Sequence, residues 1–154
     1  MRKRVNLTDA IFFADFSHQS LADEMKRIRI YSNSIVDTRS GNGNSKKDFT
    51  DFIMLDHIYR KALTSDDTDV FILLTGDGHF SSAVSFLKNI YSKEVGIYGV
   101  KDAISNQLQN CASWTIEVPY KDQELYKCYF LIQFSILIKL NRCLINKIVI
   151  IYKI

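Results

Sequence analysis

The sequence predicts an α/β fold, a three-layer sandwich in which helices cover both faces of a central, mostly parallel five-stranded sheet. Short apolar runs suited to buried strands alternate along the chain with segments whose apolar residues recur at helical spacing. Parallel neighbours in a sheet need crossover connections, and the helices that make them fold back onto the sheet. At 154 residues the chain is long enough for one such domain and too short for two of ordinary size.

The first half of the chain is expected to supply two strands and two helices. Residues 10–14, AIFFA, form a continuous apolar run that suits a strand buried on both faces. A helix is expected over residues 20–28, where a serine suited to capping is followed by a carboxylate three positions later. Residues 28–31 follow as a second strand, and the polar residues 40–47 form a loop.

The most strongly periodic helix is expected over residues 48–63. Its apolar residues recur at a period near 3.6, which is typical of a helix with one face against a core. These residues are Phe49, Phe52, Ile53, Leu55, Ile58, Tyr59 and Leu63.

The second half continues the alternation of strands and helices. Strands are expected over residues 70–75, 95–100 and 114–118, because each is a short apolar run. Helices are expected between them, over residues 80–90 and 103–111.

The chain is expected to divide into a domain of residues 1–119 and an apolar C-terminal extension of residues 120–154. The extension is rich in Ile and Leu without amphipathic spacing, and basic residues break it too often for a membrane span. Three interpretations stay open: an extra core helix and strand, a segment that binds a membrane surface or a partner, and a non-native extension. Self-association and membrane contact through this segment are therefore both open.

Charge and cysteine content narrow the function classes. A formal net charge of +3 does not by itself predict nucleic-acid binding. Three cysteines lie far apart and form no C-x-x-C pair, so neither a disulfide framework nor a zinc ribbon is expected. A reducing cytoplasm is the simplest location, and no secretory cleavage site follows the basic N-terminus.

Three aspartates fall where a parallel sheet places its ligands, outside the carboxyl ends of the strands. Asp15 and Asp77 each follow an apolar strand, and Asp51 lies near the start of the periodic helix. If the strands of residues 10–14 and 70–75 are neighbours, these carboxylates converge on one crevice. Carboxylates brought together repel unless a divalent cation neutralises them, and hard oxygen ligands favour Mg²⁺ or Mn²⁺.

Such a site has the chemistry of a metal-dependent nuclease, because the ion would orient a phosphodiester and lower the pKa of an attacking water. Gly76 and Gly78 would permit a sharp turn and close approach of a phosphate beside a helix N-terminus. Asp15 and Asp77 have simpler alternatives as turn or capping residues.

Two further side chains could assist the chemistry. His79 could act as a catalytic acid near the leaving group, or it could only form hydrogen bonds at the start of a helix. Asp56 could support the site or face solvent. A dinucleotide site is not expected, because GDGHFS carries Ser81 in place of the third glycine of the G-x-G-x-x-G pattern.

Four segments together resemble the NYN, or LabA-like, branch of the PIN-like ribonuclease superfamily, across residues 10–119. The segments are FFADFS, KKDFTDFIMLD, LLTGDGHF and VGIYGVKDAISNQLQNCASWTIEVP. The resemblance implies a Rossmann-like, PIN-like sheet, an acidic pocket for Mg²⁺ or Mn²⁺, and an RNA substrate. It places Asp15, Asp51 and Asp77 at the metal-binding positions.

The chain departs from this pattern at three positions. His79 and Ser113 stand where many relatives have carboxylates, and Ser17 replaces an asparagine and could position a metal-bound water. The resemblance therefore implies a ribonuclease that hydrolyses RNA phosphodiester bonds. The alternative is a catalytically degenerate PIN-like module that binds RNA or a protein partner.

Overall fold

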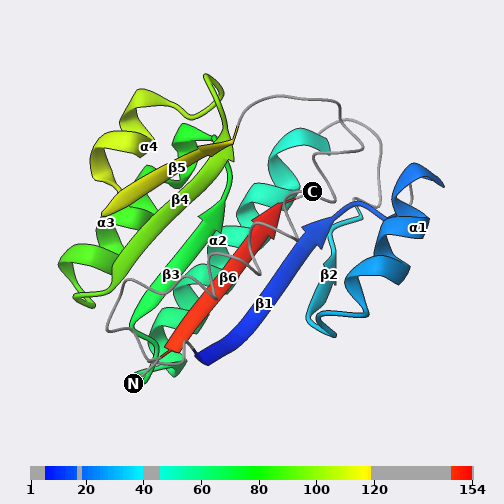
Figure 1. The fold of residues 1–154 in the computed structure, drawn as a ribbon, viewed down its shortest axis with the longest axis horizontal. Coiled ribbons are helices and arrows are strands. Elements are labelled where there is room, and N and C mark those ends of the chain that lie inside the picture. Colours follow the sequence, from blue (N-terminus) through cyan, green and yellow to red (C-terminus); the bar gives the residue numbers. More distant parts are fainter. Residues whose placement is uncertain (1–5, 17–18, 40–45, 119–146, 154) are drawn as a thin grey trace.

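The computed structural model describes residues 6–16, 19–39, 46–118 and 147–153. Six strands form one sheet in the order β2-β1-β6-β3-β4-β5, and all five of their pairings are parallel (Figure 1). The elements are β1 (Asn6–Ala14), α1 (Gln19–Ile28), β2 (Ile35–Asp37), α2 (Lys46–Thr64), β3 (Val70–Leu74), η1 (Gly78–Phe80), α3 (Ser81–Asn89), β4 (Glu94–Val100), α4 (Asn106–Cys111), β5 (Trp114–Val118) and β6 (Lys147–Lys153). The predicted α/β class is confirmed.

Two hydrophobic cores, one on each face of the sheet, make the three layers. Successive side chains of a strand point to opposite faces, so Ile11 and Phe13 of β1 face one way and Phe12 and Ala14 the other. The first pair joins a large core with α2, α3 and α4, and the second pair joins a smaller core with α1. These buried apolar surfaces hold helices on both sides of the sheet.

The sheet has one more strand than predicted, and the extra strand lies at its centre. β6 pairs with β1 on one side and with β3 on the other (Figure 1). Of the three interpretations of residues 120–154, an extra core strand describes residues 147–153, while residues 119–146 lie outside the described residues. The condition that the strands of residues 10–14 and 70–75 are neighbours is not met, because β6 lies between them and pairs with both.

The second strand lies later in the chain than predicted. Residues 28–31 end α1 in a turn, where the Tyr31 amide donates to the Ile28 carbonyl at 2.8 Å. Ile35 and Val36 form the strand instead, and they pair with Phe12 and Phe13 of β1. The strand was predicted from the apolar side chains near residue 30. These do not enter a core, and Ile30 is 76% exposed.

The buried face of α2 agrees only in part with the predicted one. The side chains that point into the protein are Asp51, Met54, Ile58 and Ala62, which recur at helical spacing. Several aromatic and apolar residues assigned to the core face lie outside it, and Phe52 is 66% exposed. The predicted face is correct for the other residues, since Ile58 is buried in the core and three more pack against it, namely Ile53, Leu55 and Tyr59.

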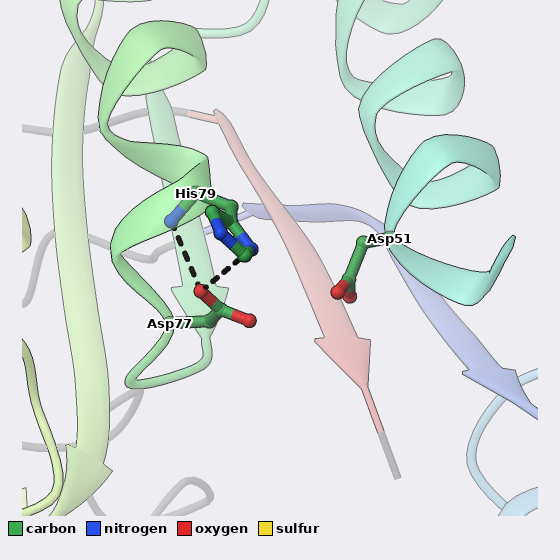
Figure 2. A group of neighbouring side chains, drawn as sticks. All are labelled: Asp51, Asp77 and His79. Atoms are coloured by element: carbon green, nitrogen blue, oxygen red, sulfur yellow. Dashed lines mark hydrogen bonds and ion pairs between the residues drawn. The ribbon is translucent and has the colours of Figure 1, made fainter. Parts of the chain in front are cut away.

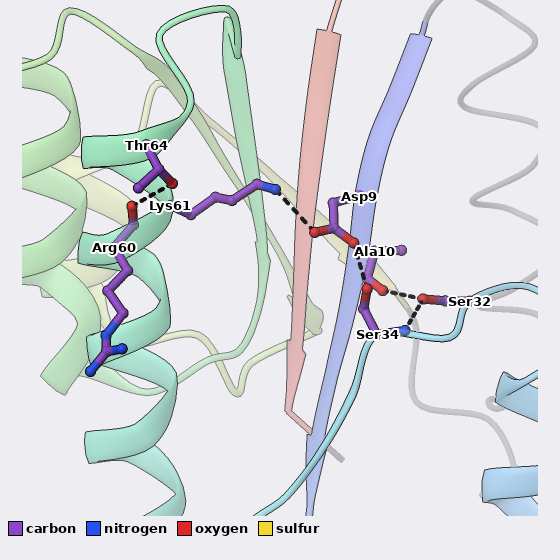
Figure 3. Close-up of polar contacts among 7 residues, drawn as sticks. All are labelled: Asp9, Ala10, Ser32, Ser34, Arg60, Lys61 and Thr64. Atoms are coloured by element: carbon purple, nitrogen blue, oxygen red, sulfur yellow. Dashed lines mark hydrogen bonds and ion pairs between the residues drawn. The ribbon is translucent and has the colours of Figure 1, made fainter.

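An ion pair between α2 and β1 fixes the helix against the sheet. Lys61 Nζ lies 3.0 Å from Asp9 Oδ2, and both side chains are about three-quarters buried. In Figure 3 the Lys61 side chain extends from α2 toward β6, and the Asp9 carboxylate reaches in front of β6 to meet it. Asp9 Oδ1 accepts a hydrogen bond from the Ser34 hydroxyl at 2.9 Å. The same carboxylate thus links α2, β1 and the segment that leads into β2.

Within the described residues, none of the helices is both long and apolar enough to cross a bilayer. The interpretation of the C-terminal extension as a membrane-binding segment concerns residues that lie mainly outside those described.

Replacing Ile151 of β6 by alanine should destabilise the protein strongly. Ile151 is completely buried in the large core, so truncation removes apolar contacts and leaves a cavity. We expect the free energy of unfolding, measured by urea denaturation, to fall by about 2–5 kcal/mol. The matched control is Ile30→Ala at an exposed turn, where a change within about 0.5 kcal/mol is expected. Equal effects of the two substitutions would contradict the central position of β6.

Candidate metal site at the carboxyl ends of the strands

Asp77 lies in the turn that joins β3 to α3, and its carboxylate organises that turn. The chain leaves β3 through Thr75 and Gly76 and then forms the short 3-10 helix η1. Asp77 Oδ1 caps η1 by accepting a hydrogen bond from the His79 amide at 3.0 Å. The Asp77 amide donates to the Thr75 hydroxyl at 3.1 Å. The capping role left open by the sequence is therefore real, and it holds the carboxylate just beyond the strand end.

The two glycines beside Asp77 are explained by packing within the protein. A Cβ added to Gly76 would lie 2.2 Å from the Ala103 carbonyl oxygen, and one added to Gly78 would lie 2.9 Å from Ser105 Oγ. The Ser105 amide also donates to the Gly76 carbonyl at 2.9 Å. The turn after β3 is thus pressed against the segment that enters α4. This contact accounts for the glycines without the phosphate that the sequence analysis invoked.

Asp51 reaches the same edge of the sheet from α2. It lies on the face of the helix that also buries Met54 and Ile58, and it is only 7% exposed. A carboxylate on the core-facing side of a helix is costly to bury, so it must find polar partners there. Asp51 lies three residues before Met54 and seven before Ile58, so its place on the buried face follows from helical spacing.

Asp51, Asp77 and His79 form one cluster of candidate metal ligands. One ligand atom from each side chain lies within 4.8 Å of the other two. Figure 2 shows the Asp51 carboxylate on α2 facing the Asp77 carboxylate and the His79 ring across the end of β6. His79 Nδ1 lies 3.2 Å from Asp77 Oδ1, so the imidazole is already directed at the cluster.

The donor set of this cluster suits a divalent cation. Two ligands held about 2.1 Å from the same ion lie at most about 4.2 Å apart. The cluster therefore needs only small side-chain adjustments to close around an ion. His79 is 76% exposed and Asp77 35% exposed, so both side chains have room to make them.

Asp15, the third predicted metal ligand, is not a member of this cluster. It follows β1, and β6 separates β1 from β3. Neighbouring strands lie about 4.8 Å apart, so the backbones of β1 and β3 are about 10 Å apart. Asp15 acts electrostatically on Arg39, whose pKa is raised mainly by its hydrogen bond to Asp37 and to a smaller extent by the charge of Asp15.

The remaining predicted residues lie elsewhere or outside the described residues. Asp56 is on the outer face of α2, where its carboxylate pairs with Arg60. The Ser113 hydroxyl accepts a hydrogen bond from the Val95 amide at 3.1 Å, near the amino ends of β4 and β5. That is the edge of the sheet opposite the cluster. Ser17 lies outside the described residues.

A parallel α/β sandwich with carboxylates gathered at the carboxyl ends of its strands is the architecture of a PIN-like nuclease domain. The NYN domain family model matches residues 1–119, and the chain belongs to this family. The PIN-like resemblance read from the sequence is thereby confirmed at the level of the family. β6 lies beyond the matched residues, although it occupies the centre of the sheet.

A solved structure is similar to this chain over most of its length. It is a protein of unknown function, VPA0982, from Vibrio parahaemolyticus RIMD 2210633. The two are 28% identical with a TM-score of 0.54, and the match covers 77% of this chain and 69% of the other. Comparison with curated proteins gives no significant match.

Adding a methyl group at Gly76 should cost more stability than adding one at Gly78. The Gly76 Cβ would collide with the backbone carbonyl of Ala103, whereas the Gly78 Cβ would meet the Ser105 side chain, which can move at the cost of the hydrogen bond that caps α4. We expect Gly76→Ala to lower the free energy of unfolding by about 1–3 kcal/mol, and Gly78→Ala to lower it by less. Urea denaturation of the two variants checks this, and the reverse order would contradict the packing of the turn on residues 103–105.

Proposed function

We propose that this protein is a metal-dependent ribonuclease of the LabA-like branch that hydrolyses phosphodiester bonds in RNA. The observation that carries the proposal is the cluster of Asp51, Asp77 and His79 at the carboxyl ends of the strands of an NYN domain. Mg²⁺ or Mn²⁺ held there would supply Lewis-acid activation of the phosphate and of the attacking water.

The protein's own residues have distinct roles in this proposal. Asp51 comes from a helix fixed by the core, and Asp77 is fixed by its hydrogen bonds in the turn, so the two carboxylates are positioned before a substrate binds. Such preorganisation lowers the cost of reaching the transition state. His79 supplies an exposed imidazole as the third side chain of the cluster. Asp15 remains a predicted third carboxylate, at the end of β1 on the same edge of the sheet.

A second candidate function is a catalytically degenerate module that binds RNA or a protein partner without cutting RNA. The observation that favours it is that Asp15, the third predicted carboxylate, is not a member of the cluster, and that β6 lies between its strand and the strand that leads to Asp77. With fewer negative charges beside it, the ion would be held more weakly than by three converging carboxylates.

Other features of the proposal follow from the sequence. We place the protein in the cytoplasm, because its cysteines fit a reducing compartment and form no disulfide pattern. RNA is the proposed partner, and a dinucleotide is not. Self-association or membrane contact through residues 120–154 would be additional to the function of the cluster.

Cleavage of end-labelled single-stranded RNA tests the proposal. We expect wild-type protein to cut RNA with Mn²⁺ or Mg²⁺ and to stop in EDTA. Asp51→Asn and Asp77→Asn should each lower the rate by about 100-fold or more, because the ion contributes several kcal/mol to the transition state. An asparagine at position 77 can still cap η1, so the fold should persist.

Asp56→Asn is the matched control for these variants, since it removes a carboxylate from the outer face of the same helix. It should leave the cleavage rate unchanged. Cutting by Asp77→Asn at the wild-type rate would overturn the assignment of the site. Metal-supported RNA binding without cutting, unchanged in Asp77→Asn, would favour the degenerate module.

A further inference from the structure

We propose that His79 is a metal ligand and that it makes this site prefer first-row transition-metal ions, such as Co²⁺ or Zn²⁺, to Mg²⁺. The inference deepens the proposed function, because it names the ion class of the same site, and it is tested by binding alone. The sequence analysis assigned the metal to three carboxylates. The structure instead brings an imidazole together with two of them.

The placement of His79 favours a role as ligand. Its backbone amide is held by Asp77 Oδ1, so the residue is anchored beside the cluster even when its side chain rotates. Its ring nitrogen Nδ1 lies 3.2 Å from the same oxygen, and the side chain is 76% exposed. No packing in the core therefore holds the imidazole away from an ion between Asp51 and Asp77.

The alternative role of His79, as a residue that only starts a helix, requires its amide and not its imidazole. The hydrogen bond that caps η1 is made by the backbone N–H, which every residue except proline could provide. The direction of the imidazole toward Asp77 is a separate feature of this side chain. Substitution of His79 therefore separates the two roles, because the cap remains when the ring is removed.

The chemistry of the ligands decides which ions would bind. Mg²⁺ demands oxygen ligands and gives up its water reluctantly, so it gains little from an imidazole. Imidazole suits Zn²⁺, Fe²⁺, Ni²⁺ and Cu²⁺, and affinity for nitrogen-containing sites rises from Mn²⁺ through Co²⁺. A site with two carboxylates and one imidazole is thus expected to bind Co²⁺ or Zn²⁺ more tightly than Mg²⁺.

Isothermal titration calorimetry of the full chain with Co²⁺ and with Mg²⁺, in the absence of RNA, measures this preference. We expect wild-type protein to bind Co²⁺ at least about tenfold more tightly than Mg²⁺. His79→Asp should lower that ratio by about tenfold, because it replaces the nitrogen ligand by oxygen. The visible absorption of bound Co²⁺ gives a second readout, since it changes when a nitrogen ligand is lost.

His57→Asn is the matched control. His57 lies on α2, where its ring packs edge-on against Phe13 with centroids 5.1 Å apart, and it is not part of the cluster. This variant should keep the wild-type Co²⁺ to Mg²⁺ ratio and the Co²⁺ absorption. Far-UV circular dichroism of both variants verifies that each is folded.

An unchanged Co²⁺ to Mg²⁺ ratio and an unchanged Co²⁺ spectrum in His79→Asp would overturn the inference. The test is separable from the proposed ribonuclease activity. Selective Co²⁺ binding without RNA cleavage would support the ion preference and count against the enzyme. RNA cleavage by a protein that binds Mg²⁺ as tightly as Co²⁺ would support the enzyme and contradict the ion preference.

Discussion

The hydrogen bonding of β6 to both β1 and β3 is the constraint on which the rest of the structure depends. Among the described strands, β2 and β1 form one half of the sheet and β3, β4 and β5 form the other. β6 is the strand that joins the halves, in parallel register with each. Its pairing sets the width of the sheet on which α2 packs, and it sets the separation of the strand ends that carry Asp15 and Asp77.

Contacts outside the candidate metal site fix the positions of its side chains. α2 is held by its buried face and by the ion pair between Lys61 and Asp9, about two turns or more from Asp51. The turn that carries Asp77 is held by close packing of Gly76 on Ala103. Two carboxylates on independently fixed elements can face each other without a substrate, which is what a preorganised site requires.

The sequence predicted most of the architecture and part of the site. Alternating apolar runs and periodic segments were sufficient for the α/β class, because burial of apolar surface against a parallel sheet leaves few other arrangements. Asp51 and Asp77 were identified from their positions at a helix start and a strand end. Phe52 and Ile30 were predicted to be buried and are exposed. Apolar side chains also occur on protein surfaces, and residue type alone does not show which of them are buried.

Local patterns by themselves determined the helices, the buried strands β1, β3 and β4, and the turn between β3 and α3. Those features depend on residues close together in the chain, so the sequence displays them directly. Only the tertiary structure decided that residues 147–153 lie between β1 and β3, and that His79 takes the place beside Asp51 and Asp77 that was assigned to Asp15. Strand order arises from pairing between distant segments, and parallel strands carry no turn that marks their neighbour.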